Sequence, residues 1–189
     1  MRQVTARLQG RAGAGVLQPW RDLRKQMGKE SIAPDGSSAV FSIAPLVAFS
    51  AVFVIAAVSP FLTTRSRTDG VADLFAIVGL LLLGTVALAL GALDTGTAFG
   101  GMGASREVMV AALAEPAILV AGFALSTRVN SSNLADMVEG VALAPADAAT
   151  PANLFAAVAI GIVVLAESGR LPVDNPSSHL ELTMLHEAM

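Results

Sequence analysis

The chain has 189 residues, of which 54% are hydrophobic and only 14% are charged. A typical soluble domain carries about 25% charged residues, because a small globule needs polar side chains over its large exposed surface. The composition therefore excludes an ordinary soluble domain, and its hydrophobicity excludes extended disorder. The absence of cysteine excludes disulfides and thiolate-bound metals. A net charge of −3 gives no argument for nucleic-acid binding. The hydrophobic composition instead predicts an integral protein of the cell membrane.

Residues 1–38 form a basic segment that holds seven of the twelve Lys and Arg residues. The segment lacks the apolar region of a signal peptide. Leu17, Trp20, Leu23 and Met27 recur at three- and four-residue spacing, which predicts a helix with one apolar stripe. Such a helix suits the headgroup layer of a membrane, and docking on a partner subunit is the alternative.

Residues 39–168 contain four apolar stretches, and roughly 20 helical residues are enough to cross a hydrocarbon core. Because the stretches are continuous and rich in Ala and Leu, they do not fit the alternating pattern of a membrane barrel. The predicted fold class is all-α, a polytopic transmembrane helix bundle with an amphipathic cytoplasmic helix before it. The four predicted spans cover residues 40–62, 73–93, 107–126 and 152–166.

The basic residues predict the orientation of these spans, since cytoplasmic loops carry an excess of Lys and Arg. With residues 1–38 in the cytoplasm, nine basic residues lie on that side and three on the other. Both ends of the chain are then cytoplasmic, including the loop and following helix expected over residues 169–189.

Glu115 lies inside the third predicted span, where a charged group is costly and usually functional. It is eight residues, or about 12 Å of helix, beyond Glu107. Pro116 removes a backbone donor beside it and favours a kink that admits water. Two interpretations stay open: proton transfer by Glu115, or a static buried ion pair with Arg106 or Arg170.

The stretch from Asp94 to Gly103 is rich in glycine and is predicted to form a cytoplasmic turn. It lacks the G-x-x-x-x-G-K-[ST] pattern of a phosphate-binding loop, so a nucleotide site is not expected. In the tail, His179 and His186 share one face of a predicted helix, but together with Glu187 they match no established metal-ligand spacing. We therefore expect no metal site there.

Three groups of motifs resemble one family, the membrane subunits of energy-converting nickel–iron hydrogenases. These are the subunits of formate hydrogenlyase and hydrogenase-4 type complexes, which are homologous to subunit 1 of respiratory complex I. The resemblance covers essentially the whole chain, and the tail motif is highly specific. The motifs are Ala6-Arg-Leu-Gln-Gly-Arg11 with Leu17-Gln-Pro-Trp-Arg-Asp22, the segment from Leu93 to Glu107, and the segment from Glu167 to Met189.

The resemblance implies a non-catalytic membrane-anchor subunit of an oxidoreductase complex. Such a subunit docks a cytoplasmic hydrogenase arm and contributes to proton or sodium translocation coupled to electron transfer. No cofactor is implied in this chain. The nickel–iron centre and iron–sulfur clusters are expected in partners, namely the hydrogenase large and small subunits and an iron–sulfur subunit, with antiporter-like membrane subunits alongside. The implied ion-path residues are Glu107, Glu115, Glu167, Arg106 and Arg170. Those implied at the junction with the hydrogenase arm are Asp94, Asp174, His179, Glu181, His186 and Glu187.

Two alternatives follow from where the chain departs from related patterns. Ser177 and His179 stand where the complex I pattern has two further glutamates, which disfavours a quinone-site subunit of an NADH:quinone oxidoreductase. A freestanding transporter, or a structural anchor without an ion path, is the other alternative. Family members have a further apolar helix before the first motif and further spans after the last one. We therefore expect this chain to be part of an eight-span protein.

Overall fold

The computed structural model describes residues 6–13, 15, 17–30, 33–60, 69–144 and 150–168. The chain divides into two compact units, residues 1–33 and residues 34–189, and each is considered by itself. The described residues are mainly helical. Their one strand-like feature is an isolated antiparallel bridge between Asp73 and Asn133. The predicted all-α fold class is confirmed.

The first unit contains α2, which runs over Gln18–Met27. Pro19 lies in its first turn, where a missing backbone N–H costs nothing, and the helix ends before Gly28. This is the amphipathic helix that the spacing of Leu17, Trp20, Leu23 and Met27 predicts. None of its residues is buried.

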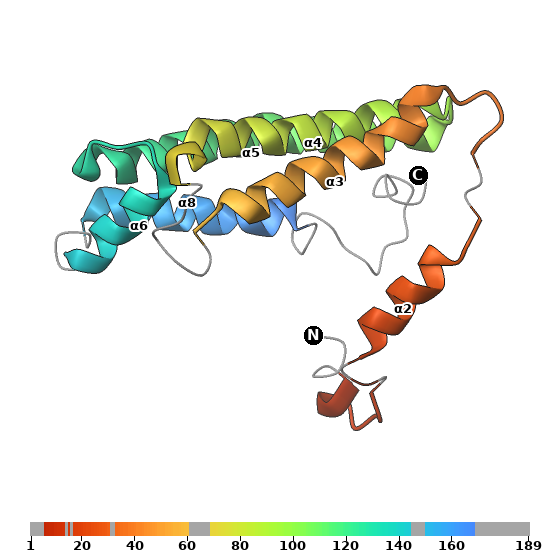
Figure 1. Ribbon diagram of the computed structural model, residues 1–189, viewed down its shortest axis with the longest axis horizontal. Coiled ribbons are helices and arrows are strands. Elements are labelled where there is room, and N and C mark those ends of the chain that lie inside the picture. Colours follow the sequence, from red (N-terminus) through yellow and green to blue (C-terminus); the bar gives the residue numbers. More distant parts are fainter. Residues whose placement is uncertain are drawn as a thin grey trace. The chain divides into compact units, whose positions relative to one another are not determined.

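The second unit is a bundle of five named helices, shown in Figure 1 with a short 3-10 turn at Asp69–Val71. Three helices are long and apolar enough to cross a membrane, over Ala39–Val58, Leu74–Asp94 and Ala98–Thr127. The fourth predicted span is a shorter apolar helix of 17 residues. The helices of the bundle are α3 (Ala39–Val58), α4 (Leu74–Asp94), α5 (Ala98–Val129), α6 (Leu134–Leu143) and α8 (Pro151–Glu167).

Each helix of the bundle begins at a polar side chain that accepts a hydrogen bond from a backbone N–H of its first turn. Such caps satisfy donors that have no partner within the helix. They explain why the apolar runs become helical where they do. The capping residues are Ser38, Asp73, Thr97, Asn133 and Thr150.

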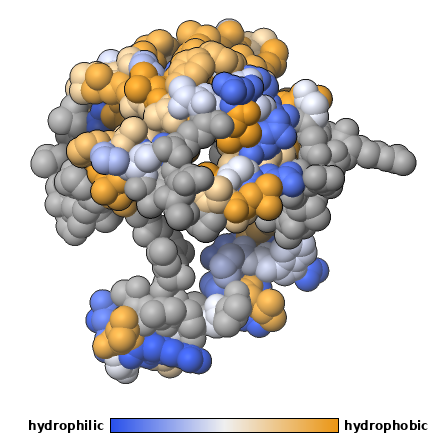
Figure 2. Space-filling view, turned by 90° about the vertical axis from the view of Figure 1, so that its left-hand side faces the viewer, coloured by the Kyte–Doolittle hydropathy of each residue, from blue (hydrophilic) through white to orange (hydrophobic). Residues whose placement is uncertain are grey.

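The interior of the bundle consists mostly of small side chains. Among the residues that the structure describes, eleven of the fifteen buried hydrophobic ones are alanines, including Ala92 with no exposed surface. At Gly84 a Cβ atom would lie 3.8 Å from the Cα of Ala48, so α3 and α4 approach closely there. Large side chains such as Phe49 face outward. In the one face that Figure 2 shows, hydrophobic residues cover much of the upper part of the bundle. This distribution is typical of helices that pack through small residues in lipid.

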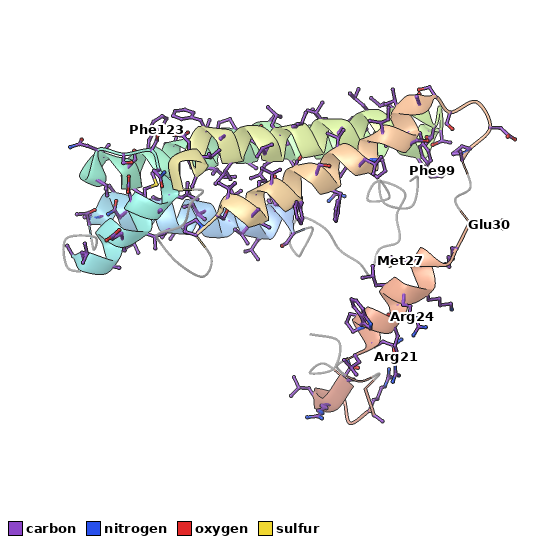
Figure 3. All side chains as sticks on the ribbon, in the orientation of Figure 1. Arg21, Arg24, Met27, Glu30, Phe99 and Phe123 are labelled. Atoms are coloured by element: carbon purple, nitrogen blue, oxygen red, sulfur yellow. The ribbon has the colours of Figure 1, made fainter. Side chains whose placement is uncertain are left out.

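α5 is the central helix of the bundle. It packs against α4, α6 and α8, while α3 packs on the other side of α4. Its 32 residues extend about 48 Å at 1.5 Å per residue, which exceeds the roughly 30 Å hydrocarbon core. Figure 3 labels Phe99 near its beginning and Phe123 towards its end. Phe123 makes an edge-to-face contact with Phe75 of α4, with ring centroids 5.2 Å apart.

The prediction of a turn over residues 94–103 is wrong for residues 98–103, which are helical. Only Thr95, Gly96 and Thr97 separate α4 from α5, and Gly96 has a positive φ of 64°. The following glycines are helical, because the Thr97 hydroxyl accepts from the Gly100 N–H at 3.0 Å and starts α5 nine residues before the predicted span. Glycine is needed at position 100 for packing, since a Cβ atom there would lie 2.3 Å from the Ala92 carbonyl oxygen.

Sequence reasoning also missed α6, which follows α5 directly. The turn between them uses Asn130 in the left-handed conformation, with φ of 51°. Ten residues are too few to span a membrane, so hydropathy gives no signal for this helix. The available signal is Asn133 immediately before an apolar segment, a typical start of a helix.

Candidate functional site

Two acidic side chains project from the central helix, α5. Glu107 lies near its beginning and Glu115 lies eight residues further, which is about 12 Å along the helix axis. Both are half-buried. Between Glu107 and Pro116 the helix buries Ala111 and Ala114, so the acids lie beside tightly packed small residues.

A third acid, Glu167, reaches this region from α8, although it is 52 residues beyond Glu115 in the sequence. It is the last residue of α8, which packs along α5. The Glu167 carboxylate interacts electrostatically with those of both Glu115 and Glu107. Glu167 is exposed at the end of its helix and lies within electrostatic range of both acids of α5, without forming a compact cluster with them.

Like charges that interact electrostatically oppose one another, so the protonation of Glu167 is coupled to that of Glu107 and Glu115. Such a group can receive a proton at one member and release it from another. It can also be neutralised by a cation. In the described part of the chain, no three His, Cys, Asp or Glu side chains gather in a way that could hold a metal ion.

Pro116 follows Glu115 within α5. Because proline has no backbone N–H, it makes no helical hydrogen bond to the carbonyl of Ala112, one turn earlier. The Ala112 carbonyl therefore lacks this helical partner, one turn before Pro116 on the same helix as Glu115. The arrangement provides an acceptor for water or for a protonated carboxyl at this level of the helix.

Arg106, predicted to hold or tune the acids, is half-buried next to Glu107 on α5 and has an interaction of its own. Arg170, the other predicted partner, lies outside the described residues. The same holds for most of the predicted junction residues, namely Asp174, His179, Glu181, His186 and Glu187.

Asp94, the remaining predicted junction residue, joins two helix ends. Its carboxylate accepts hydrogen bonds from the backbone N–H and the hydroxyl of Ser38, at 2.6 Å and 2.7 Å. It also accepts from the backbone N–H of Phe41 at 3.2 Å. The last residue of α4 therefore caps the start of α3, where a negative charge complements the helix dipole. A part for Asp94 in docking another subunit stays a prediction.

A second polar junction, which sequence reasoning missed, lies at the opposite end of α4. The N–H of Leu74 donates to the Ser132 carbonyl at 2.9 Å, and the N–H of Leu134 donates to the Ala72 carbonyl at 2.8 Å. Asp73 accepts from the Ser132 hydroxyl and from the N–H of Phe75. The Ser132 hydrogen bond is the main cause that lowers the pKa of Asp73. This junction joins the starts of α4 and α6.

An apolar cavity of about 560 Å³ lies beside the start of α8. Leu125 of α5, Val141 of α6 and Phe155 of α8 are among its lining residues. Leu125 is ten residues, or about 15 Å of helix, beyond Glu115. The cavity is therefore separate from the acids.

Comparison with known proteins identifies the family to which the chain belongs. Residues 1–186 match the family model described as NADH dehydrogenase. The chain belongs to the NADH dehydrogenase family. A solved structure of the membrane-bound sulfane sulfur reductase, an archaeal respiratory membrane complex, includes a chain that shares the fold. The alignment has a TM-score of 0.65 and 22% identity, and it covers 99% of this chain and 65% of the other.

Several curated members of the family are similar over most of the present chain. Formate hydrogenlyase subunit 4 of Escherichia coli (strain K12) is 34% identical, over 96% of this chain and 59% of its own length. Hydrogenase-4 component C of the same organism is 32% identical, over 96% and 57%. An NADH-quinone oxidoreductase subunit of Rhodospirillum rubrum is 31% identical, over 96% and 55%. The chain thus spans somewhat more than half the length of these relatives.

Proposed function

We propose that the chain is the membrane-anchor part of a hydrogenase-type respiratory complex and that its three acids carry protons. The position of Glu167, which interacts with both Glu107 and Glu115, carries this proposal. Two half-buried acids of α5 and an exposed acid at the end of α8 lie within electrostatic range along an otherwise apolar pair of helices, where charged groups are usually functional. The names of the formate hydrogenlyase and hydrogenase-4 relatives support the hydrogenase assignment.

In this proposal the hydrogen chemistry takes place outside the chain. Nickel–iron and iron–sulfur sites use cysteine ligands, and the sequence contains no cysteine. Partner subunits on the cytoplasmic side supply these centres, and the chain docks them through the ends of its helices. Both ends of the chain face the cytoplasm in this arrangement, in agreement with the excess of basic residues there.

The test is Glu115→Gln in the complete complex, with Glu139→Gln in α6 as the matched control. Gln keeps the volume and hydrogen-bonding capacity of Glu but cannot release a proton. We expect Glu115→Gln to leave the complex assembled and to reduce ion movement per hydrogen evolved, whereas Glu139→Gln leaves both unchanged. Assembly is measured by co-purification, and ion movement is measured in sealed vesicles.

Two results would contradict the proposal. Loss of assembly in Glu115→Gln would indicate a static ion pair, because removal of one charge leaves a buried arginine uncompensated. Unchanged assembly and unchanged ion movement would show that Glu115 has no part in either.

A second candidate function is a subunit of a quinone-reducing complex. The Rhodospirillum rubrum relative, an NADH-quinone oxidoreductase subunit, favours it by its name. The two candidates differ in the reaction that supports ion movement. Vesicles containing the complex would pump during hydrogen evolution in the first case, and only during quinone reduction in the second.

A further inference from the structure

The apolar stripe of α2 is exposed and is not covered by other described residues of its unit. Leu17, Trp20, Leu23 and Met27 are each between 50% and 81% exposed. A ten-residue helix is marginally stable in water by itself, so a face of this kind gains stability when it is covered. Figure 3 shows Met27 and Arg21 on different sides of the helix.

The basic residues of α2 follow one edge of the part of the stripe formed by Trp20, Leu23 and Met27, and Leu17, which precedes the helix, lies at the angle between Arg24 and Arg21. At about 100° per residue, Arg24, Arg21 and Lys25 succeed one another around the helix, beginning beside the apolar residues. Asp22 lies beyond them on the polar face, where its carboxylate accepts from the Gln18 amide at 2.8 Å. Long basic side chains in such a position extend to a charged layer while their stems cover apolar surface.

The sequence segment around α2 is also positively charged overall. Residues 1–38 carry seven basic and three acidic residues, whereas residues 39–189 carry five basic and twelve acidic ones. Anionic lipids at the cytoplasmic leaflet attract basic segments close to membrane-spanning helices. Because the bundle itself spans the membrane, a lipid surface is always within reach of α2 and binding is effectively intramolecular.

We propose that α2 is an anionic-lipid-binding helix, which lies in the headgroup layer with Trp20, Leu23 and Met27 in the acyl boundary and its basic edge on lipid phosphates. The membrane fits both faces of the helix at once: apolar chains cover the stripe, and negative headgroups lie level with the arginines. Trp is suited to this depth because its ring is apolar and its N–H remains hydrated. The proposal is independent of the proposed ion path.

Trp20 provides the probe, since the chain has one tryptophan and no tyrosine. The full chain is reconstituted into vesicles of phosphatidylcholine, or of an equal mixture of phosphatidylcholine and phosphatidylglycerol. Each lipid set is prepared with and without brominated acyl chains, which quench a tryptophan at their depth. We expect stronger quenching and blue-shifted emission in the anionic vesicles, with the difference reduced by salt. Both leaflets have the same composition, so the orientation of the chain does not affect the result.

Two variants separate charge from hydrophobicity. The combined Arg21→Gln, Arg24→Gln and Lys25→Gln variant keeps the stripe. The equilibrium constant between membrane-bound and unbound α2 is obtained from the quenched fraction of the Trp20 emission. In anionic vesicles this variant should lower that constant about a hundredfold, at about fivefold for each basic residue. The control, Asp22→Asn, keeps an acceptor for Gln18 and should raise the constant about fivefold by the same rule.

Three outcomes would overturn the proposal. Equal quenching in neutral and anionic vesicles would show that charge has no part in binding. An unchanged constant in the triple variant would show the same for these three residues. Blue-shifted emission without quenching by brominated lipid would show that protein, rather than lipid, covers the stripe.

Discussion

Gly100→Ala tests the close approach between α4 and the start of α5. A Cβ atom at this position would lie 2.3 Å from the Ala92 carbonyl oxygen and 2.7 Å from the Thr95 hydroxyl oxygen. Ordinary contact begins at 3.4 Å, so the backbone would have to separate by about 1 Å. Forcing extra atoms into a packed interior typically costs about 1–3 kcal/mol, while replacing Gly by Ala in a helix gains up to about 1 kcal/mol. We therefore expect a net loss of up to about 2–3 kcal/mol in the free energy of unfolding.

The next residue supplies the matched control. Gly101 lies in the same turn of α5, but a Cβ atom there would meet nothing within 4 Å. Gly101→Ala should therefore be neutral or stabilising by up to about 1 kcal/mol. Unfolding of each variant in detergent micelles, titrated with dodecyl sulfate and followed by helical circular dichroism, gives the two values. Equal effects of the two substitutions would refute the packing argument.

Two further predictions concern the polar junctions at the ends of α4. Asp94→Ala should speed amide hydrogen exchange at Phe41 of α3, because the N–H loses its acceptor, and an unchanged rate would contradict this. Asp73 has a pKa below that of the unfolded chain, so its contribution to stability is present above about pH 4 and is lost as the pH falls through the folded pKa. Unfolding measured against pH should show this loss in the acid range, and Ser132→Ala should reduce it; an unaltered profile would contradict the assignment.

The class of the protein and the approximate positions of its apolar helices are predictable from the sequence alone, and the bounds of α4 and α8 agree with the prediction to within one residue. Transfer of an apolar run into lipid depends on the composition of that run alone, so the stretches within residues 39–168 are predictable without knowledge of their neighbours. Helix starts depend on local contacts for a similar reason, since residues such as Ser38 and Thr150 act on N–H groups two or three positions away. Thr97 acts in the same way, but the glycines that follow it predicted a turn instead of the first turns of α5. The stripe of α2 follows from helical spacing alone.

Features that depend on contacts between distant segments follow only from the packed structure. Lipid is as apolar as leucine, so hydrophobicity does not select which helices meet; close approach through small residues does. Only the packed bundle therefore shows that Gly100 faces Ala92, and that Asp94 caps α3, 56 residues away from Ser38. In the same way, Glu167 of α8 comes within electrostatic range of Glu107 and Glu115 of α5 because the two helices pack along each other, a proximity that no local pattern in the sequence encodes.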